Sequence, residues 1–245
     1  LFGQSGGADL LLPRVDLSAL LPEAALAWLA ARGPAPRLGT RVTALTRSPQ
    51  GWQLSVSGSA GTDEAEENFD AVLLAYPPQE AARLVAGTDA HADWAAQATD
   101  LQHEPIATVY ARLTSPPANS NSLPQPMLAL RCDAEAPAQF VFDRGRLGGP
   151  AGLLAFVVSA SVGDKALISA QVLAQAQAQL GLQLELVQTI VEKRATFACT
   201  PGLLRPTTKI APGLLACGDY VAGPYPATLE GAVRSGLQAA RLLAA

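Results

Sequence analysis

The segment from residue 214 to residue 245 constrains the fold of this chain more than any other. A short apolar run, Leu214 to Cys217, stops abruptly at Gly218 and Asp219, as a buried strand does when a carboxylate must lie at its carboxyl end. Thr228 then provides a hydroxyl that can cap a helix, and no proline follows it. The segment therefore predicts a strand, a loop and a terminal helix. Open α/β sheets bind ligands at such strand ends.

The predicted helix carries two rows of side chains. The first has the spacing of a core-facing surface and consists of Leu229, Val233, Leu237, Ala240 and Ala244. The second is a stripe of small residues, namely Ala232, Ser235, Gly236 and Ala239. A glycine within a helix costs about 1 kcal/mol relative to alanine, so we expect another group to approach the backbone closely at Gly236. The free N–H groups at the amino end of the helix suit an electron-rich ligand edge, although a helix docked on a sheet without a ligand remains the alternative.

Gly218, Asp219 and the stretch from Thr228 to Gly236 resemble the C-terminal flavin motif of the superfamily of amine oxidases, protoporphyrinogen oxidases and phytoene desaturases. The resemblance implies that the Asp219 carboxylate binds the ribityl and phosphate region of FAD. It also implies that the start of the helix faces the pyrimidine end of the isoalloxazine ring. FAD is therefore the expected cofactor, and the residues expected to bind it in this segment are Gly218, Asp219, Thr228, Leu229 and Glu230.

The composition is that of a globular chain with enough apolar material for a sizeable core. Of the 245 residues, 49% are hydrophobic and 16% are charged, which argues against a disordered tail and allows one large domain or two modest ones. The net charge is −4 and no run of Lys and Arg occurs, so nucleic acid is not an expected partner. Cys132, Cys199 and Cys217 lack CxxC spacing, which argues against a disulfide framework or a zinc site and favours a reducing, cytoplasmic compartment.

Other chemical motifs are absent from the sequence. The two histidines, His91 and His103, have no acidic partner at metal-ligand spacing, so no metal is expected, and His91 is predicted to be a solvated residue within a helix. No GxSxG nucleophile elbow occurs. No apolar run reaches the ~18 residues of a transmembrane helix. The first residues lack the features of a signal peptide, and the absence of an initial methionine indicates a portion of a longer protein.

Residues 1–100 are predicted to form the second part of a FAD-binding, Rossmann-like domain of mixed α/β (α+β) character. The predicted elements are a flexible entry (Phe2–Asp9), a helix (Pro22–Ala31), a hairpin (Leu38–Leu45 and Trp52–Val56), a polar loop (Gly58–Asn68), a buried parallel strand (Phe69–Tyr76) and two helices (Gln79–Val85 and Asp89–Thr99). This order resembles the second half of the superfamily's FAD domain, in which a residue placed like Val42 touches the adenine through its backbone. An ordinary strand residue is the alternative for Val42.

Residues 101–200 are predicted to form an inserted, β-rich substrate-binding domain, because the FAD-type pattern resumes only at residues 201–245. The predicted elements of this insertion are strands at Ile106–Leu113, Met127–Cys132, Phe140–Asp143, Leu153–Ser159 and Leu184–Phe197, and a helix at Asp164–Leu180. In the superfamily that the chain resembles, such an insertion forms the wall of the substrate site.

Three stretches, Asp9–Leu20, Glu192–Gly202 and Pro224–Thr228, are similar to the hydroxysqualene dehydroxylases of bacterial hopanoid pathways. This resemblance implies FAD-dependent reduction of hydroxysqualene, an apolar isoprenoid, to squalene, with peripheral contact at the inner membrane as a further expectation. Two alternatives stay open. One is another enzyme of the flavin amine oxidase type, acting on an amine, a protoporphyrinogen or a carotenoid. The other is a non-catalytic remnant of a flavin fold.

The sequence assigns no catalytic residue. Departure of a hydroxyl calls for a proton donor, and Glu192, Lys193 and Arg194 are candidates, although structural pairing among buried side chains is an equal reading. Cys199 is predicted to be a packed, neutral thiol rather than a redox group. The superfamily also begins with a strand, a GxGxxG loop and a helix that hold the FAD diphosphate, and no GxGxxG occurs in these 245 residues. The missing amino-terminal portion of the same enzyme is therefore the expected partner.

Overall fold

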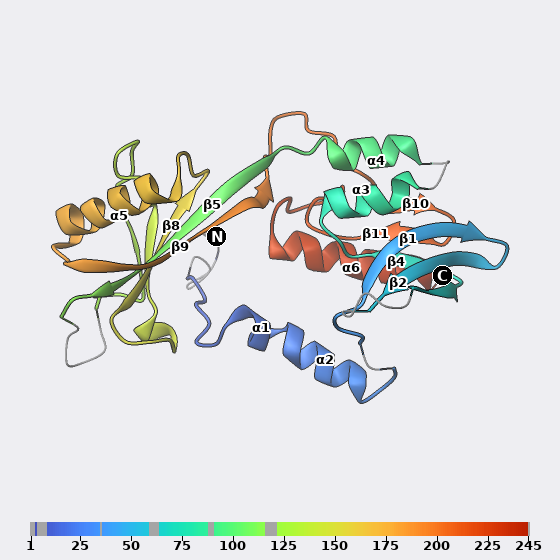
Figure 1. Cartoon of the computed structure of the whole chain (residues 1–245), viewed down its shortest axis with the longest axis horizontal. Coiled ribbons are helices and arrows are strands. Elements are labelled where there is room, and N and C mark those ends of the chain that lie inside the picture. The colour runs from blue at the N-terminus through green and yellow to red at the C-terminus, as the bar shows by residue number, and fades with distance from the viewer. Residues whose placement is uncertain are drawn as a thin grey trace. The chain divides into compact units, whose positions relative to one another are not determined.

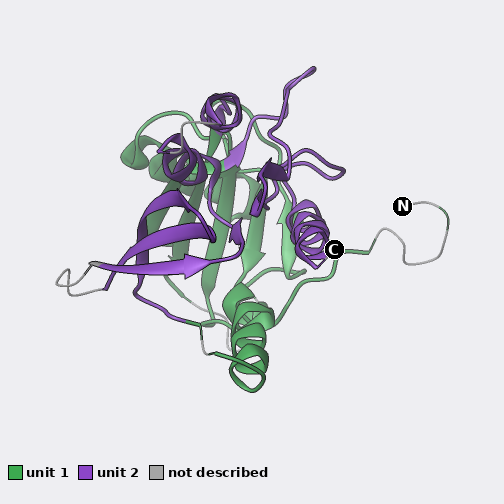
Figure 2. Ribbon diagram, turned by 90° about the vertical axis from the view of Figure 1, so that its right-hand side faces the viewer, with its two compact units in different colours: residues 1–36, 104–195 green, residues 37–103, 196–245 purple. Residues whose placement is uncertain are grey.

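The computed structural model describes Gly3 and residues 9–34, 36–58, 64–87, 91–115 and 122–244, and the chain divides into two compact units (Figures 1 and 2). The first unit comprises Leu1–Pro36 and Glu104–Ala195, and the second comprises Arg37–His103 and Thr196–Ala245. Residues 1–36, expected with the flavin-binding part, cluster instead with the inserted sheet. The predicted flexible entry at Phe2–Asp9 lies almost entirely outside the described residues.

An antiparallel meander forms the first part of the second unit. Its strands, in sheet order, are β1 (Arg41–Ser48), β2 (Gly51–Ser57) and β3 (Glu64–Phe69). Trp52 on β2 pairs with Arg47 on β1 and with Phe69 on β3, so the predicted hairpin is confirmed and gains a third strand. The prediction of a polar loop over Gly58–Asn68 is wrong from residue 64 onward, because backbone pairing with β2 overrides the low strand propensity of these acidic residues.

A short sheet carries the carboxyl-terminal strand. β10 (Lys209–Ala211) pairs antiparallel with β11 (Leu214–Ala216), and β11 pairs parallel with β4 (Val72–Leu74). The parallel strand predicted at Phe69–Tyr76 is therefore shorter than expected, because Phe69 belongs to β3 and the chain bends at Asp70 before β4 begins. The helices of this unit are α3 (Pro78–Ala86), α4 (Ala92–Thr99) and α6 (Leu229–Leu243).

One hydrophobic core joins the meander, the short sheet, α3 and α4. Its largest fully buried side chains include Trp52 and Tyr220. Indole N–H groups fix the loop that leads into β10 and β11, since Trp52 donates to the Pro212 carbonyl at 3.2 Å and Trp94 donates to the Thr207 carbonyl at 2.8 Å. His91, predicted to lie within a helix, is instead the N-cap residue of α4 and is half-buried.

The terminal helix α6 docks through its small residues. Gly231, Ser235 and Ala239 are its buried residues, and these small side chains let the helix backbone come close to the sheet. The predicted core-facing row, which begins at Leu229, is exposed instead, so that prediction is wrong for this structure. Apart from the backbone of the helix itself, no described atom lies within 4 Å of a Cβ atom added at Gly236, so the close approach predicted there is wrong within the described part of the chain.

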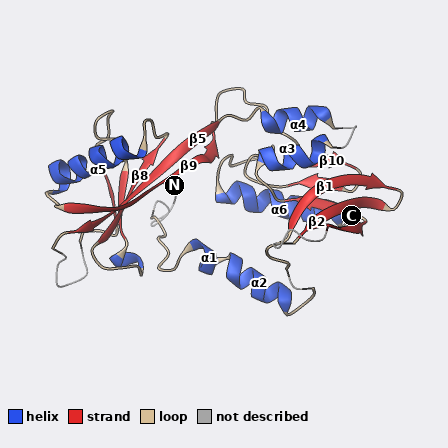
Figure 3. Cartoon of the chain, viewed as in Figure 1, coloured by secondary structure: helices blue, strands red, loops and turns tan. Residues whose placement is uncertain are grey.

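The first unit is built on a five-stranded sheet (Figure 3). Its strands, in sheet order, are β6 (Met127–Ala129), β7 (Phe140–Asp143), β8 (Leu153–Ser159), β5 (His103–Leu113) and β9 (Leu184–Phe197). Helix α5 (Lys165–Leu180) begins at its capping residue Asp164 and ends at Gly181, as the sequence predicts. The core between α5 and the sheet includes Val109, Phe156 and Val172.

Two short helices, α1 (Leu17–Leu20) and α2 (Pro22–Ala30), precede the sheet in the chain, and neither has a buried residue. A 3₁₀ turn, η1 (Gly145–Leu147), follows β7. The buried Asp143 carboxylate holds this turn, because it accepts the N–H groups of Gly145 at 3.1 Å and of Ser122 at 2.7 Å. None of the described helices is both long enough and apolar enough to cross a bilayer.

Candidate functional site

The candidate site begins where β11 ends. All three residues of β11 are buried, and the strand leads into Gly218 and Asp219 at the carboxyl end of its parallel pair with β4. The Gly218 N–H donates to Ser235 Oγ on α6 at 2.9 Å, and Ser235 Oγ donates to the Ala232 carbonyl at 2.7 Å. A Cβ atom at position 218 would lie 2.5 Å from the Tyr220 ring, so only glycine fits there.

The Asp219 side chain is half-buried where the chain leaves β11. Burial raises the pKa of this carboxyl above its ordinary value, although backbone N–H groups of Asp219 and Tyr220 and the positive charges of His103 and Arg205 act in the opposite direction. None of the ion pairs among the described residues includes Asp219. The carboxylate therefore keeps acceptor capacity for hydroxyl donors of a ligand.

The loop between β11 and α6 is strained and held in place. Tyr225 and Ala227 have left-handed φ values of 57° and 56°, which non-glycine residues seldom adopt and which concentrate at functional sites. The Arg205 guanidinium donates to the carbonyls of Val221, at 2.9 Å, and Gly223, and so ties the loop down. The Ala227 N–H donates to the Asp219 carbonyl at 3.4 Å, which closes the loop onto the end of the strand.

The start of α6 leaves two backbone donors free of the helix ladder. Thr228 Oγ1 accepts the N–H of Gly231 at 3.0 Å and donates to the Tyr225 carbonyl at 2.7 Å, while Ala232 N–H donates to the Thr228 carbonyl at 3.1 Å. The N–H groups of Leu229 and Glu230 precede these bonds and lie at the positive end of the helix dipole. The Glu230 carboxylate pairs instead with Arg234 along the helix surface.

Val42 lies at the edge of the meander in the same unit. It pairs with Val56, and the register shifts between Val42 and Ala44, which marks a bulge at this point of the edge strand β1. The Arg83 guanidinium donates to the Thr43 carbonyl at 3.1 Å and supports the bulge. Val42 packs against the core that contains Tyr220, but none of the hydrogen bonds among the described residues joins Val42 to the β11–α6 loop.

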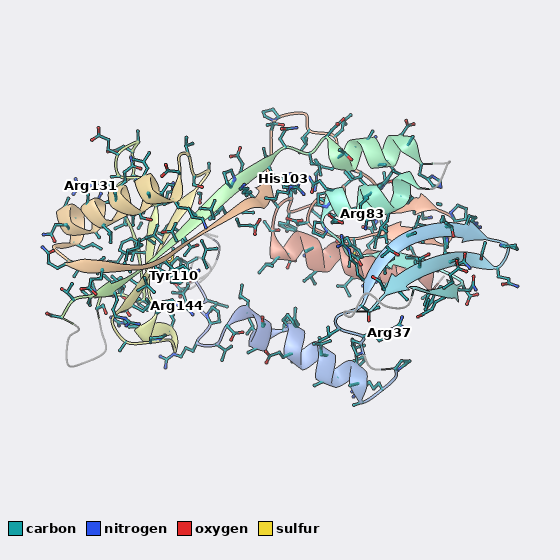
Figure 4. All side chains as sticks on the ribbon, in the orientation of Figure 1. Arg37, Arg83, His103, Tyr110, Arg131 and Arg144 are labelled. Carbon is teal, nitrogen blue, oxygen red and sulfur yellow. The ribbon has the colours of Figure 1, made fainter. Side chains whose placement is uncertain are left out.

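The structure thus gathers Gly218, Asp219 and the residues at the start of α6 into one strand–loop–helix unit, as the sequence predicts, whereas Val42 stands on a separate sheet. Two residues near Asp219 are not predicted from the sequence, namely His103 at the start of β5 (Figure 4) and Arg205. His103 Nδ1 lies 2.9 Å from the Leu101 carbonyl and 3.1 Å from the side-chain nitrogen of Gln79. No spacing in the sequence indicates either residue, because only the tertiary fold brings them to the strand end.

Two expectations for chemically active residues need correction. Glu192, Lys193 and Arg194 are all exposed on β9, so they are not a buried, structurally paired group, and the hydrogen bond found among them joins the Arg194 N–H to the Glu192 carboxylate at 3.2 Å. Cys199 is exposed rather than packed in a core. Among the described residues, no three His, Cys, Asp or Glu side chains lie close enough together to hold a metal ion.

A parallel strand pair that ends at a half-buried carboxylate, followed by a helix with free N–H groups, is typical of α/β proteins that bind flavins and other dinucleotides.

The fold agrees with two solved structures. A candidate protoporphyrinogen oxidase from Exiguobacterium sp. 255-15 superposes with a TM-score of 0.66 at 18% identity, over 94% of this chain and 51% of that one. An oxidoreductase from Methanosarcina mazei superposes with a TM-score of 0.61 at 16% identity, over 86% and 51%.

The sequence model of the family described as flavin containing amine oxidoreductase matches residues 17–244, and the chain belongs to this family. It is similar to two proteins named hydroxysqualene dehydroxylase. The protein from Rhodopseudomonas palustris is 32% identical over 96% of this chain and 53% of its own length. The protein from Sinorhizobium fredii is 29% identical over 95% of this chain and 52% of its own length. The chain therefore spans about half the length of these relatives.

Proposed function

We propose that this chain is the carboxyl-terminal portion of a FAD-dependent oxidoreductase that reduces hydroxysqualene to squalene in hopanoid and squalene biosynthesis. The observation that carries the proposal is the unit formed by Asp219 and the open amino end of α6, in a chain that belongs to a flavin family. The choice of substrate is supported by the names of the two relatives. The enzyme would act in the cytoplasm.

The donors and acceptors of the site fit FAD. The Asp219 carboxylate would accept hydrogen bonds from hydroxyls of the ribityl chain, and the N–H groups of Leu229 and Glu230 would donate to the oxygen- and nitrogen-rich edge of the pyrimidine ring. Gly218 and Thr228 would shape the backbone around these contacts. The bulge beside Val42, on an edge strand with backbone groups not used by β2, would meet the adenine. When bound in its reduced form, FAD would supply a hydride to the carbon from which the protonated hydroxyl leaves as water.

The face of the five-stranded sheet opposite α5 supports an apolar substrate. Register places Tyr110, Ala155 and Phe142 side by side across β5, β8 and β7, on the face opposite the core beneath α5 (Figure 4 labels Tyr110). Phe140 on the same face is 38% exposed, and Val157 beside it is half-buried. We propose that this face lies against the isoprenoid chain and that the Tyr110 hydroxyl provides a polar group on it.

The other candidate functions receive less support. Amine oxidases often pair the flavin with an aromatic cage, and only two tyrosines lie near the motif here. Tyr220 is only 1% exposed, while Tyr225 is exposed and stacks with Arg234, whose guanidinium carbon lies 5.1 Å from the ring centroid. A desolvated carboxylate and a strained loop both destabilise the fold, and such features cluster at functional sites. Their presence together at a strand end argues against a non-catalytic remnant.

Peripheral membrane contact is part of the proposal, because the substrate is apolar. Large apolar side chains gather on the exposed surface of the amino-terminal segment, namely Leu10, Leu11, Val15, Leu17, Leu20, Leu21, Trp28 and Leu29. We expect the chain to float with phosphatidylcholine vesicles in a flotation assay. The double variant Leu11→Asp, Leu17→Asp should no longer float with them. If the double variant floats as well as the unaltered chain, this segment does not contact lipid.

The proposed function can be tested by joining this chain to the part of the Rhodopseudomonas palustris relative that lies outside the matched span, here called its remaining portion. The joined protein should bind FAD and convert hydroxysqualene to squalene when supplied with a reductant, with no turnover of simple amines. Asp219→Ala should weaken FAD binding roughly ten-fold or more, since charge-assisted hydrogen bonds contribute ~1.5–3 kcal/mol. Asp100→Ala, an exposed aspartate in the same unit, is the control and should leave FAD affinity unchanged. Turnover of amines but not hydroxysqualene would overturn the proposal.

A further inference from the structure

A cavity lies at the amino end of helix α5, within the first unit. Its volume is about 520 Å³, and proteins bind small molecules in pockets of about 300–1,000 Å³. Its walls come from the end of β8 and the loop after it, from the first two turns of α5, and from the segment between β6 and β7. Val158 on its wall belongs to the core beneath α5. The cavity is therefore on the other side of the sheet from the face proposed to lie against the isoprenoid chain.

A row of glutamines on α5 holds one wall of the cavity in place. Three of them, at every fourth position, bond to the segment from residue 131 to residue 138, namely Gln171, Gln175 and Gln179. The first donates to the Ala134 carbonyl at 3.0 Å. The second, which is buried, accepts the Ala138 N–H and donates to the Ala138 carbonyl, both at 2.9 Å. This wall is thus formed before any ligand arrives, and a ligand need not order it.

A buried hydroxyl on the opposite wall has no partner. Ser161 lines the cavity and is 9% exposed, and its Oγ makes no hydrogen bond to any described atom. The backbone here is fixed, because the Ser161 N–H donates to the Pro105 carbonyl at 3.0 Å and Ala160 is held at a left-handed φ of 49°. Buried polar groups are nearly always hydrogen-bonded in native proteins, so a hydroxyl without a partner on a cavity wall points to a partner that binds in the cavity.

The charges around the cavity restrict what that partner can be. No lysine, arginine or histidine is among the described residues that line it. The amino end of α5 already has a negative cap, since the Asp164 carboxylate accepts the Leu167 N–H at 2.8 Å. Asp133 on the wall has its Oδ1 engaged by the N–H groups of Glu135 and Ala136. A phosphate or a carboxylate would therefore find no positive partner, and the ligand expected here is neutral.

The remaining groups on the wall are one further polar donor and several apolar side chains. Gln139 Oε1 accepts the Ser159 N–H at 2.8 Å, and the amide NH₂ of Gln139 makes no hydrogen bond to the described residues. Pro137, Val162 and Leu167 also line the cavity, and the last two are 87% and 51% exposed. The wall thus offers two polar groups to an oxygen atom and an apolar surface to a hydrocarbon chain.

We propose that this cavity binds a neutral, mostly apolar molecule that carries a single hydroxyl or carbonyl oxygen. The oxygen bonds to Ser161 Oγ and to the amide of Gln139, and the hydrocarbon part covers Val162 and Leu167. The inference goes beyond the proposed function, because it requires neither FAD nor hydroxysqualene.

Cys132 provides a reporter for the cavity. It lines the cavity and is exposed, whereas Cys199 is exposed elsewhere and Cys217 is buried. In a Cys199→Ser background, N-ethylmaleimide should label Cys132, and the probe geraniol, a neutral alcohol, at ten times its dissociation constant should slow the labelling about ten-fold. Geranyl diphosphate, which has the same chain and an anionic head, should not slow it. Myrcene, the corresponding hydrocarbon without oxygen, should bind about five-fold more weakly than geraniol.

Two serine variants provide the matched comparison. Ser161→Ala should weaken geraniol protection of Cys132 about five-fold, because the variant lacks the partner of the alcohol oxygen. Ser122→Ala should leave protection unchanged, since Ser122 Oγ is also buried without a partner among the described atoms of the same unit but does not line the cavity. Neither change breaks a hydrogen bond among the described atoms, so both variants should keep the melting temperature of the unaltered chain.

The proposal would be overturned if protection of Cys132 by geraniol did not saturate, or if the two serine variants weakened it equally. Equal protection by geranyl diphosphate would also overturn it, because the ligand would then not be neutral. Labelling that none of the three compounds slows would show that water alone fills the cavity. The same measurement on the joined protein, with the labelled peptide identified by its mass, separates the two proposals. Protection there without turnover of hydroxysqualene would overturn the proposed function and leave the cavity site standing.

Discussion

At the scale of single residues, Asp219 shows how burial sets the chemistry of a side chain at a strand end. Its carboxyl pKa is raised chiefly by burial, and the nearby positive charges of His103 and Arg205 do not cancel that effect. A carboxylate held in this way is less stable in the folded chain than in water. Such an arrangement is expected where a ligand, rather than the protein, is to supply the missing hydrogen-bond donors.

Asp219→Asn should therefore stabilise the chain alone at neutral pH. Because its pKa is raised, the Asp219 carboxyl binds a proton more tightly in the folded chain than in the unfolded chain. The stability gained from this protonation is fully present below the ordinary pKa of 3.8 and is lost as pH rises through the folded pKa. The variant should unfold at higher urea than the unaltered chain at pH 7, and the difference should shrink as the pH falls toward 3.8. A difference that does not vary with pH would show that desolvation of this carboxyl is not the cause.

Two glycines of α6 provide a matched pair for a second test. A Cβ atom at Gly231 would lie 2.2 Å from the Tyr225 carbonyl oxygen, whereas one at Gly236 meets open space. Gly231→Ala should lower the free energy of unfolding by ~1–3 kcal/mol through overpacking, and Gly236→Ala should raise it by up to ~1 kcal/mol through helix propensity. Thermal unfolding followed by circular dichroism measures both. A loss of stability in Gly236→Ala would mean that this position packs against the chain after all.

At the scale of elements, the sequence predicts those features that depend on local chemistry. Asp164 and Gly181 bound α5, and Thr228 caps α6, because capping needs only neighbouring backbone groups. The division between β3 and β4 is missed because Phe69 and the apolar residues after Asp70 resemble one nearly continuous strand that a single aspartate interrupts. The buried face of α6 is also missed. Periodicity shows that one side of a helix is apolar, but it does not show whether a neighbour covers that side.

Ser235 on α6 accepts a hydrogen bond from the segment that follows β11, and the stabilising effect of this hydrogen bond should be measurable. Ser235→Ala removes the acceptor of the Gly218 N–H and should lower the free energy of unfolding by ~1–3 kcal/mol, the usual penalty for a buried group left without its partner. Ser161→Ala is the matched control, since Ser161 Oγ is buried without a hydrogen-bond partner among the described atoms and its removal should cost nothing. Equal losses in urea unfolding would show that the Ser235 hydrogen bond does not stabilise the junction.

At the scale of the whole molecule, some residues of the candidate site can be assigned from a family motif in the sequence, whereas others are brought to the site only by the tertiary fold. The strand end and helix start carry a recognisable motif, so Gly218, Asp219 and Thr228 can be named from the sequence. Their environment cannot, because His103 and Arg205 reach Asp219 through the tertiary fold alone. The units observed also differ from the predicted domains, since residues 1–36 share a unit with the inserted sheet and no sequence pattern records that packing.

The helices of the described structure also bear on how FAD could be held. A diphosphate requires free N–H groups at a helix amino end, usually after a glycine-rich turn. Among the described helices of eight or more residues, α2 and α3 begin with proline and carry Glu23 and Glu80 in their first turns, α4 carries Asp93, and α5 is capped by the Asp164 carboxylate. Helix α6 also carries an acidic residue, Glu230, in its first turn, but this carboxylate pairs with Arg234, and the amino end of α6 is the one proposed to face the flavin ring.

We therefore expect the 245-residue chain, purified alone, to be colourless. Without contacts to the diphosphate, several charge-assisted hydrogen bonds of ~1.5–3 kcal/mol each are lost, so binding should be weaker by roughly a thousand-fold or more. An absorption spectrum during FAD titration should show no bound flavin band at micromolar concentrations, and the chain joined to the remaining portion of the relative should turn yellow at one FAD per molecule. The Asp219→Ala variant of the joined protein serves as the control for specific binding. Stoichiometric yellow FAD on the chain alone would mean that a phosphate site exists within these residues.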